Sequence, residues 1–216
     1  WYDIVPGDKS KLIWDEYYSF DELPQSTNPP TAYLQNCNST PYLATVGIGS
    51  PKITLPSNTG IEMFQTNRAY RANELYGSDK SITRKEFYEY KYDTYYSEKS
   101  VMRYALDSFL EDVDTADELL LQGVDILKKW DLGNQKDNRG AALAHLTFKL
   151  TYDINDFDYN YQFYITKFKE SCKFLIDNYG RLDIELGQLQ VIKRGDNEYP
   201  LDGGPDILRA IYSKFD

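Results

Sequence analysis

Apolar and polar positions follow two different patterns along this chain, and the change falls near Gly60. Before Gly60 the apolar residues show no regular period, and the segment contains seven prolines. Because proline fixes φ and lacks a backbone N–H, this density of proline excludes long helices. We therefore predict that residues 1–60 form an extended, proline-rich arm with turns, wrapped on another part of the protein.

Apolar residues recur at helical spacing over residues 61–180. The clearest stripe places Val101, Ala105 and Phe109 four residues apart on one face. This periodicity predicts helices over 67–76, 83–92, 101–110, 115–130, 139–151 and 161–179. Together these segments predict an α-helical domain.

Residues at the ends of these segments are typical of helix caps. Thr83 with Glu86, and Thr115 with Glu118, have the spacing of a capping box, in which each side chain bonds the other residue's backbone N–H. Gly180 follows the longest segment and is predicted to end that helix.

The last part of the chain, residues 181–216, changes pattern again. Residues 188–193 and 198–201 flank a turn at 194–197 and predict a hairpin, and residues 206–212 predict a short terminal helix. The fold class predicted is therefore mainly α, with the extended arm before the helices and a small β-hairpin after them.

Composition excludes some classes of partner. With 24 Lys and Arg against 34 Asp and Glu, the net charge is 24 − 34 = −10, which argues against nucleic acid and anionic membrane partners. No apolar run approaches the ~20 residues of a membrane span. Cys37 and Cys172 are too few for a disulfide framework or a zinc site, and they are either a pair or two free thiols.

Most residues capable of chemistry have a structural interpretation. The single histidine, His145, lies inside a predicted helix, and the sequence nominates neither a nucleophile nor an orienting partner for it. Residues 111–118 are rich in acids that suit a helix start. Residues 156–160 alternate like the first ligands of a calcium loop, but the required glycine and closing glutamate are missing. We therefore predict no metal site in this chain.

The tyrosines of residues 88–96 leave two interpretations open. Tyr88, Tyr90, Tyr92, Tyr95 and Tyr96 are either half-buried packing residues or a surface that stacks on a ligand. The second interpretation supports an alternative function, a non-enzymatic helical binding module that holds a peptide or a glycan.

Two asparagines in the arm carry a more specific hypothesis. Asn36 and Asn38 are two residues apart in a stretch with prolines at both ends, so on a strand both side chains would point to one face. An amide donor fixed in this way can stabilise the oxyanion that forms in acyl transfer. The alternative is a pair of asparagine-rich turns.

The run Asn-Pro-x-x-x-Tyr-Leu-Gln-Asn-Cys-Asn-Ser-Thr-Pro over residues 28–41 resembles the segment that carries the oxyanion asparagine in the penicillin acylase family. This is a family of N-terminal-nucleophile amidohydrolases that includes penicillin G acylase and acyl-homoserine-lactone acylases. Further resemblances follow in the family's order at residues 5–8, 20–24, 67–75, 127–131, 138–143 and 188–204.

The resemblance implies a mechanism and assigns residues to it. In this family an N-terminal serine, exposed by autocatalytic cleavage, attacks an amide carbonyl with its own α-amine as base, and water then hydrolyses the acyl-enzyme. One backbone N–H and an asparagine side chain hold the oxyanion. By the match of motifs, Asn38 is that donor, Asn36 is the fallback, and Arg68 corresponds to a family arginine near the active site.

The resemblance also implies what lies elsewhere. Since the chain begins with Trp1 rather than Ser, Thr or Cys, we expect an internal fragment of the family's β chain, inactive by itself, whose partners are the α chain and the rest of the β chain. The parent enzyme is expected to be periplasmic or secreted and to cleave N-acyl amides of the penicillin or homoserine-lactone type. Glu62 is the only acid between Asn38 and Arg68, so no cofactor is assigned here, and calcium is left to the parent protein.

Overall fold

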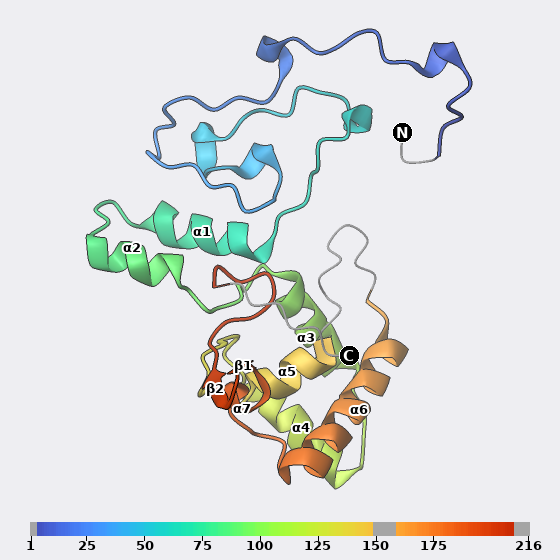
Figure 1. Ribbon diagram of the computed structural model, residues 1–216, viewed down its shortest axis with the longest axis vertical. Coiled ribbons are helices and arrows are strands. Elements are labelled where there is room, and N and C mark those ends of the chain that lie inside the picture. Colours follow the sequence, from blue (N-terminus) through green and yellow to red (C-terminus); the bar gives the residue numbers. More distant parts are fainter. Residues whose placement is uncertain (1–3, 149–158, 210–216) are drawn as a thin grey trace.

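The computed structural model describes residues 4–148 and 159–209. Figure 1 shows an arm at one end of the molecule, a helical body at the other, and a helix pair between them. The helices are α1 (Asn67–Ser78), α2 (Arg84–Lys91), α3 (Val101–Asp112), α4 (Glu118–Lys129), α5 (Ala141–Phe148), α6 (Tyr161–Tyr179) and α7 (Leu186–Leu189), and the strands are β1 (Val191–Arg194) and β2 (Asn197–Pro200). The mainly α fold class is confirmed. In the described ranges no helix is long and apolar enough to cross a bilayer.

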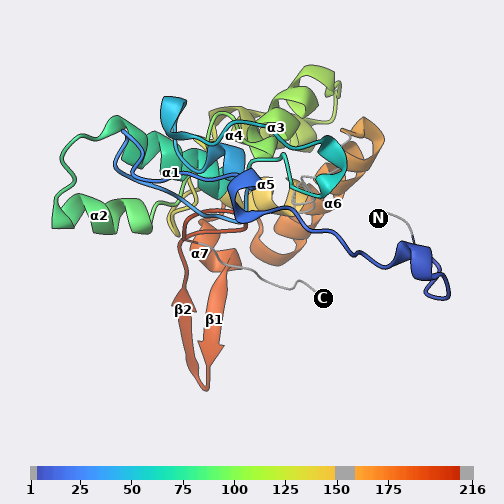
Figure 2. The same cartoon turned by 90° about the horizontal axis from the view of Figure 1, so that it is seen from above.

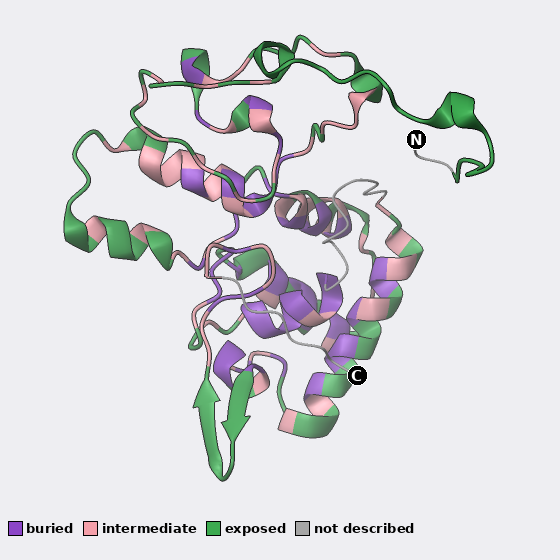
Figure 3. Cartoon of the chain, turned by 45° about the horizontal axis from the view of Figure 1, so that its top comes forward, coloured by how far each residue is buried: buried purple, intermediate pink, exposed green. Residues whose placement is uncertain are grey.

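The arm is irregular, as its proline content predicts. Its described part, residues 4–60, contains single 3-10 turns joined by extended chain and no strand. Its buried residues, such as Tyr42 and Thr45, all fall within residues 40–49, whereas Trp14 and Phe20 are each 73% exposed. Figure 3 shows the start of the arm as exposed throughout. The first third of the arm therefore leaves large apolar side chains uncovered.

One of the two predicted capping boxes is confirmed and one is wrong. At α2 the Thr83 N–H donates to Glu86 Oε2 at 2.7 Å, and the Glu86 N–H donates to Thr83 Oγ1 at 3.3 Å. At α4 the cap is Asp117, which accepts from the N–H groups of Leu119 and Leu120. A carboxylate directly before the helix displaces the more distant threonine because it also favours the positive helix end.

The longest helix begins and ends where the sequence predicts. Asn160 caps α6 by accepting from the N–H of Phe163 at 3.1 Å. At the other end Gly180 adopts a left-handed φ of 73° and its N–H donates to the Ile176 carbonyl at 3.0 Å. A side chain at this position would be strained, which explains why the helix stops at a glycine.

The core of the helical body surrounds α5. Seven of its eight residues are buried, and it contacts α3, α4, α6 and α7. Phe148 at its end meets Phe109 of α3, whose ring also lies 5.1 Å from that of Phe168 of α6. An apolar helix of this kind has no solvent face, so it forms the centre of the body.

The hairpin projects away from the helices, as Figure 2 shows. Its strands are antiparallel, from Val191 opposite Pro200 to Arg194 opposite Asn197, and every residue of both is exposed. At its base the Gln190 side chain donates to the carbonyls of Leu201 and Gly203 at 3.1 and 3.0 Å.

The predicted helix over 206–212 is wrong for the part that is described. Residues 206–209 form turns and bends, and residues 210–212 lie outside the described ranges. Long-range partners take the backbone groups that a helix would need: the Tyr96 hydroxyl donates to the Pro205 carbonyl at 2.8 Å, and the Arg209 N–H donates to the Asp93 carbonyl at 3.1 Å.

His145 is a core residue that supports this C-terminal segment. Its Nε2 lies 2.5 Å from Asn134 Oδ1, while the Asn134 amide nitrogen donates to the carbonyls of Thr94 and Leu132. Nε2 is therefore the protonated nitrogen of a neutral ring. A Cβ at Gly204 would lie 2.5 Å from His145 Cε1, so the turn packs directly on the imidazole. Burial lowers the pKa of His145 to about 4.

This histidine makes stability depend on pH. The unfolded chain binds the His145 proton below about pH 6.5 and the folded chain does not until about pH 4, so stability is complete above that window and falls within it as the pH drops. We expect the free energy of unfolding to fall by about 3 kcal/mol more in wild type than in His145→Gln between pH 7 and pH 4. Urea denaturation across this range measures the difference, and parallel pH profiles would contradict it.

Candidate functional site

The segment that carries Asn36 and Asn38 is extended but is not a strand. Asn36 and Asn38 are exposed and Cys37 is half-buried, and residues 37–39 form a bend, which agrees with the alternative of asparagine-rich turns. The prediction of a strand is wrong because Asn38 adopts a left-handed φ of 55°, which an asparagine tolerates. The Asn38 N–H donates to Asn36 Oδ1 at 3.3 Å, and this contact closes the bend.

The bend is attached to the first turn of α1. The Thr66 hydroxyl donates to the Cys37 carbonyl at 3.0 Å and accepts from the Ala69 N–H at 3.1 Å, so one side chain both caps the helix and holds the bend. The Thr40 N–H also donates to the Phe64 carbonyl at 3.0 Å. These bonds bring Asn38 beside the second residue of α1.

That second residue is Arg68. Its Nη2 donates to Asn38 Oδ1 at 3.0 Å, so two of the residues that the sequence nominates lie in contact. Asn36 does not bond Arg68; its carboxamide oxygen accepts a hydrogen bond from the Asn38 N–H. Within the described residues the Asn38 Nδ2 group has no hydrogen-bond partner and lies on an exposed residue. The carboxamide oxygen of Asn38 is therefore bonded to Arg68, and its NH2 group remains able to donate a hydrogen bond.

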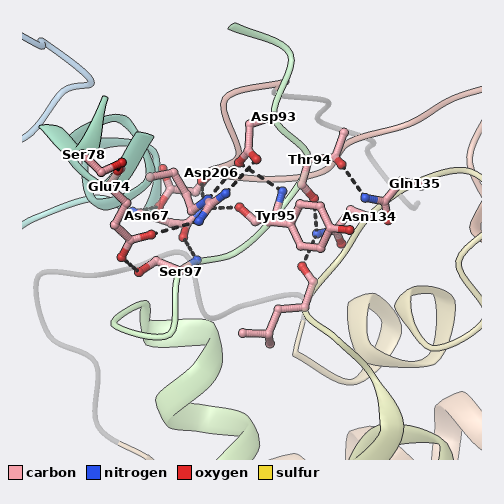
Figure 4. A network of polar contacts seen from close by, with 12 residues as sticks. Asn67, Glu74, Ser78, Asp93, Thr94, Tyr95, Ser97, Asn134, Gln135 and Asp206 are labelled. Carbon is pink, nitrogen blue, oxygen red and sulfur yellow. Dashed lines mark hydrogen bonds and ion pairs between the residues drawn. The ribbon is translucent and has the colours of Figure 1, made fainter. Parts of the chain in front are cut away.

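Asp206 completes the site and was missed by the sequence analysis. Its Oδ1 accepts from Arg68 Nε at 3.0 Å, and its Oδ2 accepts from the N–H of Asn67, the first residue of α1, at 2.7 Å. The Asn67 side chain in turn donates to the Asp206 carbonyl at 2.7 Å (Figure 4). Asp206 is 138 residues from Arg68 and falls in a predicted helix, so no local pattern indicates the contact.

Two opposing effects act on the pKa of Asp206. Burial raises the pKa of this carboxyl above the ordinary aspartate value, and the hydrogen bonds from Asn67 and Arg68 oppose the rise. The ionised form is the one that these donors and the positive end of α1 favour.

A second ion-pair network lies one turn further along α1. Arg71 donates to both Asp93 oxygens, from Nε at 2.9 Å and from Nη2 at 2.8 Å, and from Nη1 to Glu74 at 3.0 Å. Glu74 accepts from the Ser97 hydroxyl at 2.6 Å, and the Ser97 N–H donates to Asn67 Oδ1 at 2.7 Å (Figure 4). This network attaches α1 to the helical body without contacting Arg68.

Neither cysteine has the properties of a nucleophile. Both are free thiols; burial raises the pKa of Cys37, and it raises the pKa of Cys172 to about 12. An activated thiol needs the opposite shift.

The described residues contain no group of three or more His, Cys, Asp or Glu side chains suited to a metal ion. The aspartates at 156 and 158, considered above for a calcium loop, lie outside the described ranges.

The tyrosines of residues 88–96 do not form one surface. Tyr88 of α2 and Tyr92, the residue that follows this helix, are half-exposed, with their ring centroids 6.5 Å apart in a stacked arrangement. Tyr90 packs edge-on against Tyr76 of α1, and Tyr96 is buried in the core. Some of these tyrosines therefore pack inside the protein, and others are exposed to solvent.

A comparison with known protein families identifies the family of this chain. The family model described as penicillin amidase matches residues 2–174. The chain belongs to the penicillin amidase family. The match includes the Asn38 bend and the first turn of α1, whereas Asp206 and the hairpin follow it. Penicillin amidases are hydrolases that act on linear amides, so this chain is related to acylases and amidohydrolases.

The Arg71–Asp93 pair should contribute strongly to stability. The two side chains are only 19% and 10% exposed, so Asp93→Asn leaves a buried guanidinium with Glu74 as its remaining counter-charge and without its bidentate partner. We expect a loss of about 3 kcal/mol in the free energy of unfolding. The exposed pair between Asp125 and Lys129 provides the comparison, and Asp125→Asn should cost about 0–1 kcal/mol. Equal losses in the two variants, measured by chemical denaturation, would refute this expectation.

Proposed function

We propose that this chain supplies the oxyanion donor of a penicillin-amidase-type hydrolase and that Asn38 is the donor. The observation that carries the proposal is the 3.0 Å contact from Arg68 Nη2 to Asn38 Oδ1. Because the amide oxygen is held by the guanidinium, the amide nitrogen faces away from it with both hydrogens free to donate. Asn36 lacks such a contact and supports the bend instead.

The proposed role of Asn38 is electrostatic stabilisation of the transition state. When a nucleophile attacks an amide carbonyl, the carbonyl oxygen acquires negative charge, and a fixed N–H donor stabilises that charge without reorganisation. Asn38 Nδ2 provides one donor, and a backbone N–H elsewhere in the enzyme provides the other. The positive charge of Arg68 beside the Asn38 oxygen polarises the amide and strengthens its donor end.

The nucleophile of the proposed enzyme is an N-terminal serine in another segment of the same precursor. Its hydroxyl oxygen attacks the substrate carbonyl while its α-amine accepts the hydroxyl proton, the amine product leaves with that proton, and water hydrolyses the acyl-serine ester to the free acid. The partners of this chain are then the α chain and the remainder of the β chain. The uncovered apolar residues of the arm, such as Ile13 and Trp14, suit such an intramolecular contact.

The substrates proposed are N-acyl compounds of the penicillin or acyl-homoserine-lactone type, cleaved at a linear amide by a periplasmic or secreted enzyme. A tyrosine-lined binding surface is the weaker alternative, because the tyrosines of residues 88–96 are divided between core and solvent.

Replacement of the donor tests the proposal. In the processed enzyme that contains this chain, Asn38→Ala should lower kcat by about 10²–10³-fold, equivalent to about 2.7–4 kcal/mol of transition-state stabilisation. KM should change little, because the donor acts on charge that develops after binding. Hydrolysis of the p-nitroanilides of phenylacetic and decanoic acid provides the measurement.

Two further variants sharpen this test. Asn178→Ala, on the exposed face of α6, removes an asparagine side chain remote from the site and should leave kcat unchanged. Asn36→Ala separates the two candidates: a loss of turnover in Asn36→Ala with near-normal turnover in Asn38→Ala would move the donor role to Asn36. Near-normal turnover in both would reject the proposed function of this segment.

A further inference from the structure

Asp206 lies where three parts of the molecule meet. Its carboxylate contacts the backbone of Asn67 and the side chain of Arg68, and its own backbone carbonyl accepts from the Asn67 side chain. Arg68 continues the chain of contacts to Asn38. Asp206 and Arg68 are 16% and 23% exposed at their side chains, so most of this path is shielded from solvent.

The turn that presents Asp206 is fixed on both sides. Before it, the Gly203 N–H donates to the Asn134 carbonyl at 2.7 Å and the Pro205 carbonyl accepts from Tyr96. After it, Ile207 is fully buried and Arg209 is bonded to Asp93. The carboxylate thus has the rigidity of the helical body.

Arg68 needs such an anchor. An arginine side chain has several rotatable bonds, and a single contact with an exposed asparagine does not fix its guanidinium plane. The Asp206 carboxylate bonds Nε, which lies next to the aliphatic stem, and this leaves Nη2 directed at Asn38. Without the carboxylate, the guanidinium loses its second point of attachment.

We propose that Asp206 is a positioning residue, which holds Arg68 so that the Asn38 amide presents its nitrogen to the reacting carbonyl. The role rests on the proposed function, because it presumes that Asn38 is the oxyanion donor. Asp206 makes no contact with Asn38 itself and acts only through Arg68.

The test variant is Asp206→Asn. Asparagine tolerates the left-handed φ of 51° at this position, so the turn is kept while the charge and one acceptor are lost. In the processed enzyme we expect kcat for the phenylacetyl and decanoyl p-nitroanilides to fall about tenfold or more, with KM within about twofold of wild type, because misaimed donors cost transition-state binding.

Asp93→Asn is the matched control. It also removes the charge from an arginine–carboxylate pair of α1, but its partner, Arg71, does not contact Asn38, and the Asp93 backbone carbonyl that holds Arg209 is unchanged. It should lower stability and leave kcat within about twofold of wild type. A drop in kcat in Asp206→Asn no larger than that in Asp93→Asn would overturn the positioning role.

A double-variant cycle identifies the route of the effect. In an Arg68→Ala background, Asp206→Asn should cause no further change in kcat, since the residue through which it acts is already gone. An additional drop of the same size in that background would overturn the proposal.

Crystal structures of the wild type and of Asp206→Asn provide a readout that needs no activity. We expect the Arg68 guanidinium to leave Asn38 Oδ1 in the variant, and an unchanged 3.0 Å contact would overturn the positioning role. Full activity of Asn38→Ala together with a displaced Arg68 would reject the proposed function while supporting the anchoring of Arg68. The two failures are therefore distinguishable.

Discussion

The first turn of α1 has backbone N–H groups without helical partners, and the structure depends on how they are satisfied. Thr66 bonds one of them and the Asp206 carboxylate bonds another. Thr66 also holds the Cys37 carbonyl of the arm, and Asp206 also holds the Arg68 guanidinium. A common requirement of every helix, the capping of its start, therefore joins the arm, α1 and the C-terminal segment at one point.

Charge and burial differ between the inside of this junction and its outer edge. The inner groups form ion pairs with shielded side chains, whereas Asn38 at the edge is exposed and bonded through its oxygen alone. Rigid support behind an exposed donor is the arrangement that electrostatic catalysis requires, because a preorganised dipole costs nothing to orient during the reaction.

Local signals predict the helices well because capping and periodicity act over a few residues: α6 has its predicted ends, and Thr83 caps α2. The resemblance to a known family, and no local signal of this kind, nominates Asn38 and Arg68, which lie in two separate motifs. Local signals fail where distant groups compete for the backbone. The turn at Asp206 has a helical pattern, yet its carbonyls and N–H groups bond residues more than a hundred positions earlier, and no sequence period encodes such pairing.

The long separation between Asp206 and Arg68 also orders the assembly of the protein. During synthesis the arm and α1 emerge first, but the carboxylate that anchors Arg68 follows 138 residues later. Closing so large a loop costs entropy that local helix formation does not, so we expect this contact to form after the local helices. The bend at Asn38 closes through contacts with residues 36 to 66, whereas the anchoring of Arg68 depends on a carboxylate from the far end of the chain.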